Sequence, residues 1–142
     1  MVDGQTVERR LLKLEQVLRK LGTLARVSWD EYKNDEGIQD RVERNLQIAA
    51  QVCIDIGSHV IAGRGYRTPH SYADIFTVLE EEGLLPPDLA DTLKQIAGFR
   101  NILVHDYLEI DPEIVYRCLQ KIDDFKRFAE HVATWIRLGN CS

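Results

Sequence analysis

The chain has 142 residues, of which 44% are hydrophobic and 29% charged, and these values predict a soluble globular protein with a single domain over residues 1–142. Its formal net charge of −5 argues against a protein that coats nucleic acid with its whole surface, but it leaves room for a local basic cleft. No segment approaches the roughly 20 apolar residues of a membrane span, and the charged start of the chain is unlike a signal peptide.

The three cysteines are an odd number, lie far apart in the sequence and show no metal-ligand spacing. We therefore expect no metal site and no disulfide framework. A reducing cytoplasm is the expected location of such a chain.

The first half of the chain predicts helices. Apolar residues recur at steps of three and four over residues 6–25, which indicates a first long helix. Ser28 and Glu31 match a capping box at the start of a short helix that reaches residue 34. Gly37 is expected to break the chain before a second long helix over residues 38–62.

The second half repeats this pattern after a glycine-rich loop at residues 63–70. Ser71 and Asp74 open a third, shorter helix, and a fourth runs from about residue 88 into the polar segment 100–107. Asp111, before a proline, caps a fifth helix that is expected to continue to Gly139. No segment alternates as a strand does, so we predict an all-α, up-and-down helical bundle of four long helices plus one or two short ones.

Segment 100–107, which reads Arg-Asn-Ile-Leu-Val-His-Asp-Tyr, concentrates polar chemistry at the end of the fourth helix. Arg100 and Tyr107 fall on its apolar stripe, where an arginine costs several kcal/mol unless it is paired or faces a wet cleft. Asn101 and His105 are four residues apart and therefore neighbours on a continuous helix. A guanidinium, an amide, an imidazole and a phenol within about two turns predict a phosphate-handling site.

A structural interpretation competes with this one, because a buried arginine is often paired with a carboxylate on a neighbouring helix. Asp55 and His59 lie four residues apart on the second long helix. They either support the polar segment or make structural hydrogen bonds, with Asp55 as the expected partner of Arg100. Arg64 and Arg67 flank a tyrosine in the loop, which suits RNA binding but also suits an ordinary exposed loop.

The pattern Arg-x4-His, with Asn after the Arg and Tyr two residues after the His, resembles the signature of the HepT-like branch of the HEPN superfamily. Segments 42–47, 54–59, 72–76 and 83–86 also resemble this family, so the likeness covers roughly residues 5–137. Its members are small all-helical proteins, many of them toxins with metal-independent endoribonuclease activity. They are typically encoded beside a minimal nucleotidyltransferase that acts as antitoxin.

The resemblance implies a type VII-like toxin–antitoxin pair in which two chains form a homodimer and build one composite cleft that cleaves RNA. Arg100, Asn101 and His105 would be the catalytic residues, with no cofactor or metal. The nucleotidyltransferase would silence the toxin by transferring AMP to Tyr107. The sequence leaves two alternatives open: a non-catalytic nucleotide- or substrate-binding subunit of a nucleotidyltransferase complex, and a plain dimeric scaffold.

Overall fold

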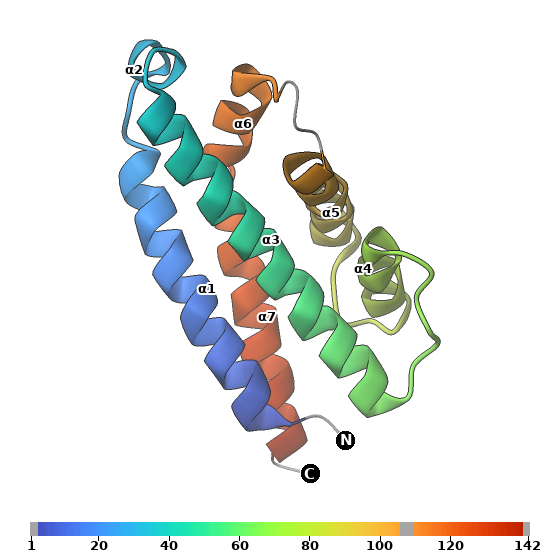
Figure 1. The fold of residues 1–142 in the computed structure, drawn as a ribbon. Helices are drawn as coiled ribbons and strands as arrows, with labels where there is room; N and C mark the ends of the chain where they lie inside the picture. Colours follow the sequence, from blue (N-terminus) through green and yellow to red (C-terminus); the bar gives the residue numbers. More distant parts are fainter. Residues whose placement is uncertain (1–2, 106–109, 141–142) are drawn as a thin grey trace.

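The computed structural model describes residues 3–105 and 110–140, and within them every regular element is a helix. The predicted all-α bundle is thereby confirmed, with four long helices and three shorter ones (Figure 1). In chain order they are α1 (Gly4–Leu24), α2 (Trp29–Lys33), α3 (Glu36–Arg64), α4 (Tyr72–Glu81), α5 (Pro87–His105), α6 (Pro112–Leu119) and α7 (Asp123–Asn140). Figure 1 shows α1, α3 and α7 side by side, with α4 and α5 on the other side of α3.

The central element is α3, which packs against α1, α4, α5, α6 and α7. Its buried residues are not confined to one stripe, as expected for a helix with neighbours on several sides. By length and composition alone α3 could cross a membrane, but 56% of its apolar stretch is buried inside the bundle. It is therefore the core helix of this fold.

The predicted helix caps are observed at Ser28, Ser71 and Asp111, each of which accepts a backbone N–H from the first turn of its helix. The start of α3 differs from our prediction, because the helix begins before Gly37 rather than after it. Asp35 is its cap and accepts the Ile38 N–H at 3.1 Å. A glycine in the first helical turn thus did not break the chain.

The predicted fifth helix is in fact two helices, α6 and α7, separated by a turn at residues 120–122. The Tyr116 hydroxyl donates to the Val27 carbonyl at 2.8 Å, and the Gln120 amide donates to the Ala25 carbonyl at 3.3 Å. These bonds tie α6 to the connection between α1 and α2, and the backbone bends after them through i→i+3 hydrogen bonds. No proline or glycine marks the break, so no local pattern in the sequence predicts it.

The interface between α3 and α4 is unusually close at Gly57, which is buried. A Cβ atom built on Gly57 would lie 2.5 Å from Cγ2 of Ile75 and 3.4 Å from Cδ1 of Leu79. Real Cβ atoms essentially never make the shorter of these contacts. The absence of a side chain at residue 57 therefore sets the distance between the two helices.

Candidate functional site

The last turns of α5 carry the polar segment that the sequence singled out. Arg100 and Asn101 lie in the helix, and the backbone of His105 is its last residue. Tyr107, and the side chain of His105, lie outside the described residues. The structure therefore describes the arginine and the asparagine of the predicted site but not its imidazole or its phenol.

Arg100 is half-buried, and three observations define its surroundings. Its Cζ atom lies 5.3 Å from the centroid of the Tyr72 ring, which is a cation–π contact. Its Nη1 donates a long hydrogen bond of 3.3 Å to Oδ1 of Asn101. Its Nε atom is buried and has no hydrogen-bond partner among the described residues.

The prediction that Arg100 pairs with Asp55 is wrong. Within residues 3–105 and 110–140, no carboxylate forms an ion pair with Arg100. Asp55, the expected partner, instead accepts a hydrogen bond of 2.8 Å from the Gln51 amide on its own helix. His59 accepts the backbone N–H of Asp3 at 3.0 Å, at the start of α1. Both residues make structural hydrogen bonds, the second of the two roles considered for them.

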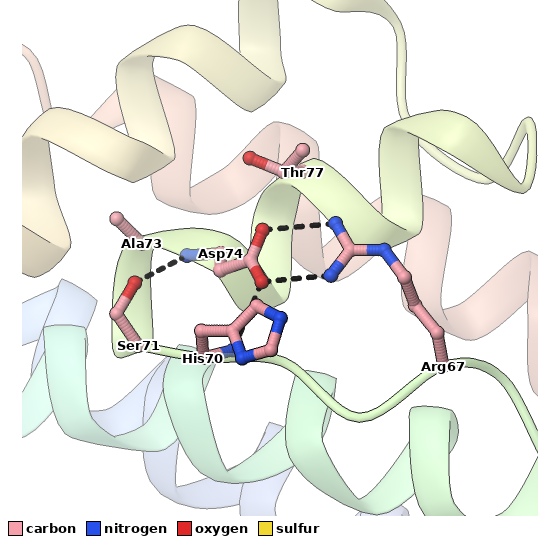
Figure 2. A pocket seen from close by; sticks show the side chains of 6 residues that line it. All are labelled: Arg67, His70, Ser71, Ala73, Asp74 and Thr77. Atoms are coloured by element: carbon pink, nitrogen blue, oxygen red, sulfur yellow. Dashed lines mark hydrogen bonds and ion pairs between the residues drawn. The ribbon is translucent and has the colours of Figure 1, made fainter.

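Beside Tyr72, the loop before α4 is held by an ion-pair cluster of Arg67, Asp74 and Glu81. Figure 2 shows the pair between Arg67 and Asp74. The Arg67 guanidinium donates to both oxygens of Asp74, at 2.8 and 2.9 Å, and to both oxygens of Glu81, at 2.9 and 3.1 Å. Asp74 also accepts the backbone N–H of His70 at 2.9 Å. Arg67, Asp74 and His70 border an open pocket of about 650 Å³.

The expectation that Arg67 binds RNA is not supported by these contacts. One guanidinium faces two carboxylates, so the cluster carries a net negative charge and does not attract phosphate. The role of Arg67 in this structure is to fasten the loop to both ends of α4. Arg64 is exposed and its Nη1 lies 3.4 Å from the hydroxyl oxygen of Tyr66, so the loop retains one exposed cation near an aromatic ring.

The ion pair makes Asp74 a source of acid sensitivity. Hydrogen bonds from the Arg67 guanidinium, followed by the backbone N–H of His70, hold the pKa of the Asp74 carboxyl well below its usual range. A carboxyl with a lowered folded-state pKa stabilises the fold above its unfolded pKa of about 4, and this contribution is lost as the pH falls through the folded-state pKa. We expect Asp74→Asn to flatten the dependence of unfolding free energy on pH between pH 5 and pH 2. Urea denaturation at several pH values measures this, and an unchanged slope would exclude Asp74 as the sensitive group.

A feature that the sequence analysis missed is an apolar groove of about 750 Å³ where α3, α5, α6 and the start of α7 meet. Ile102, from the same turn of α5 as Arg100, and Ile114 from α6 contribute to its lining. Their side chains are 49% and 47% exposed, which is unusual for isoleucine. Both fall outside the apolar stripes of their helices, and that was the signal available in the sequence.

No metal centre is evident in the part of the chain that the structure describes, since no three His, Cys, Asp or Glu side chains there lie close enough to share an ion. Cys53 and Cys118 are free thiols. Burial raises the pKa of both, which makes them poor nucleophiles.

Comparison with known proteins places the bundle and its polar segment in a defined group. The family described as ribonuclease HepT-like matches residues 14–132. The chain is 36% identical to the mRNA nuclease HepT of Shewanella oneidensis, over 88% of this chain and 89% of that protein. It is 31% identical to the tRNA nuclease HepT of Aphanizomenon flos-aquae, over 83% of this chain and 80% of that protein.

A solved structure gives the same result. The tri-AMPylated Shewanella oneidensis HEPN toxin in complex with MNT antitoxin aligns with a TM-score of 0.84 at 30% identity, covering 94% of this chain and 99% of that one. Fold and sequence therefore agree along nearly the whole length. The chain belongs to the ribonuclease HepT-like family.

Proposed function

We propose that this protein is a metal-independent endoribonuclease, the toxin of a type VII-like toxin–antitoxin pair, and that Arg100, Asn101 and His105 carry the reaction. The observation that carries the proposal is the state of Arg100. In a chain with 23 acidic residues, this half-buried arginine pairs with none of the described carboxylates. A half-buried cation with no counter-ion among the described residues is suited to binding a phosphate. The nuclease names of the relatives support the same conclusion.

The chemistry that fits these residue types is attack on phosphorus by the 2′-hydroxyl of the RNA itself. A base removes the proton of the 2′-hydroxyl as the new P–O bond forms. An acid protonates the departing 5′-oxygen, which leaves a cyclic phosphate and a 5′-hydroxyl. Histidine is the side chain that titrates near neutral pH, so His105 is the candidate for proton transfer. Arg100 would stabilise the charge that builds on the phosphate, with Asn101 as its neighbouring hydrogen-bond partner.

The one histidine in each polar segment supplies half of an acid–base pair, and a homodimer with two such segments at its twofold axis would supply both halves. The apolar groove supports this arrangement, because its exposed Ile102 and Ile114 lie on the same helix as Arg100 and on the helix that follows. Exposed apolar surface of this kind is typical of a protein–protein interface. We therefore place the second copy of the chain on this groove.

The test is cleavage of single-stranded RNA by the wild-type protein in EDTA, compared with the same oligonucleotide carrying 2′-O-methyl groups. We expect cleavage of the first and none of the second, because the methyl group removes the nucleophile. Light scattering on the same sample should return a dimer. RNA that stays intact under all conditions, with the protein still bound to a nucleotidyltransferase, would favour the alternative of a non-catalytic subunit.

We further propose that a cognate minimal nucleotidyltransferase controls the protein by transferring AMP to Tyr107, in a reducing cytoplasm. The phenol oxygen would attack the α-phosphorus of ATP and release pyrophosphate. The added phosphate would then compete with RNA for Arg100, seven residues earlier on the chain. The complex of a tri-AMPylated toxin with its antitoxin supports this assignment.

Incubation with that enzyme and ATP should place AMP on Tyr107 and abolish RNA cleavage, and peptide mass spectrometry would locate the adduct. Tyr116, whose hydroxyl is bonded to the Val27 carbonyl, serves as the internal control. An adduct on Tyr107 that leaves the cleavage rate unchanged would refute this form of control.

A further inference from the structure

We propose that Tyr72 is a positioning residue that orients the Arg100 guanidinium toward the substrate phosphate; the inference rests on the function proposed above. Arginine side chains are long and rotate freely, so a phosphate-binding arginine needs something to hold its planar group in place. A carboxylate usually does this. For Arg100, no described carboxylate does so, and the described groups in contact with its guanidinium are the Tyr72 ring and the amide of Asn101.

Of these two contacts, the one with the Tyr72 ring is better suited to orient the guanidinium. The hydrogen bond that Arg100 donates to Asn101 is 3.3 Å long, and its acceptor is an exposed side chain on the next residue of the same helix. The Tyr72 ring belongs to a different helix, and the Arg100 Cζ lies 5.3 Å from its centroid. A guanidinium over an aromatic face keeps its charge and its N–H edge available to an anion, whereas a carboxylate would neutralise the charge.

The Tyr72 ring is attached to a backbone segment, the start of α4, that several hydrogen bonds hold in place. Tyr72 is the first residue of α4 and follows the cap residue Ser71, whose Oγ accepts the Asp74 N–H at 3.1 Å. The Asp74 carboxylate is held in turn by both terminal nitrogens of Arg67 and by the backbone N–H of His70 (Figure 2). Arg67 also binds Glu81 in the last turn of the same helix.

This arrangement suggests a structural function for the ion-pair cluster. Its net negative charge does not favour phosphate binding, but its hydrogen bonds fix the backbone at Tyr72. Tyr72 is 41% exposed, so its ring is placed at the surface beside Arg100 rather than in the core. This supporting role accounts for a large exposed aromatic residue at the start of α4, in contact with an arginine that pairs with no described carboxylate.

The experiment compares Tyr72→Leu, which removes the aromatic face, with Tyr72→Phe, which keeps it and removes only the hydroxyl. Binding of a 2′-O-methyl RNA oligonucleotide is followed by fluorescence anisotropy in the wild-type and Arg100→Ala backgrounds. We expect Tyr72→Leu to weaken binding about two- to fivefold in the wild-type background and not at all in Arg100→Ala. On unmodified RNA, it should lower kcat by about tenfold to a hundredfold, with a smaller change in KM. Tyr72→Phe should behave as the wild type.

A readout independent of RNA is the NMR signal of the Arg100 side chain, which the Tyr72 ring current should displace and which Tyr72→Leu should return toward its ordinary position. Loss of binding that is equal in both backgrounds would mean that the ring contacts the RNA directly, and would overturn the inference alone. The same holds if Tyr72→Leu cleaves RNA as the wild type does. A wild-type protein that neither binds nor cleaves RNA, in the presence of a displaced Arg100 signal, would overturn the proposed function and this inference with it.

Discussion

Replacement of His105 by alanine is expected to lower kcat for RNA by about a hundredfold to ten-thousandfold, because general acid–base catalysis contributes that much. Replacement of Arg100 by alanine should lower it by about a hundredfold to a thousandfold, the usual effect of removing one group that stabilises a developing charge. The free energy of unfolding of Arg100→Ala should change by no more than about 1 kcal/mol, since its main described contact is one partly exposed cation–π pair.

The matched control is Arg117→Ala, which removes an exposed arginine whose partner, Glu113, is one turn away at 2.6 Å. Its cleavage rate and stability should both stay close to those of the wild type. Cleavage rates in EDTA and urea denaturation of the same preparations provide the measurements. If Arg100→Ala were destabilised by about 3–5 kcal/mol, Arg100 would be a structural ion-pair partner after all. Full activity in His105→Ala would remove the proposed proton transfer.

Substitution of Gly57 by valine should produce the largest loss of stability of any single change considered. Even the first atom of the new side chain would lie 2.5 Å from Cγ2 of Ile75, so α3 and α4 must move apart. Inserting extra carbon atoms into a packed core costs about 1–3 kcal/mol and sometimes more. We expect at least this loss in the free energy of unfolding, measured by urea denaturation.

Gly22 in α1 gives the opposite result and serves as the control. A Cβ there would meet no atom within 4 Å, so Gly22→Ala brings only the better helix propensity of alanine. It should stabilise the fold by about 0.5–1 kcal/mol. If both substitutions changed the free energy of unfolding equally, the close approach of α3 and α4 at Gly57 would not limit which side chains that position accepts.

The helices could be predicted because their signals are local. Apolar spacing located α1, α3 and α5, and cap residues located the starts of the short helices α2, α4 and α6. The apolar residues that recur at steps of three and four in α3 are buried: Val42, Leu46, Ala49, Cys53, Ile56 and Val60. The division between α6 and α7 could not be predicted in this way. It depends on bonds from Tyr116 and Gln120 to carbonyls about 90 residues earlier in the chain. In α7, Phe128 and Trp135 are buried, whereas the next residues, Ala129 and Ile136, are only partly buried.

For the candidate site, too, only the features that depend on local residue spacing could be predicted. The unusual position of Arg100 on an apolar stripe followed from residue spacing, and its half-buried state agrees with that prediction. Its contact with Tyr72 and the absence of a pair with Asp55 depend on how α3, α4 and α5 pack together. For Arg67, the sequence left RNA binding and an ordinary exposed loop as the alternatives. Its ion pairs with Asp74 and Glu81 were not predicted, because the fold brings these residues together from the two ends of α4.

The apolar groove between α3, α5, α6 and α7 has a consequence for how strongly the protein acts at different concentrations. If each reaction centre needs two chains joined at this groove, the number of centres rises with the square of the chain concentration while chains are scarce. A few molecules that escape their antitoxin would then do little harm, and harm would rise steeply once synthesis outpaced control. The exposed Ile102 and Ile114 would in this way set a threshold dose for toxicity, which no property of an isolated chain could provide.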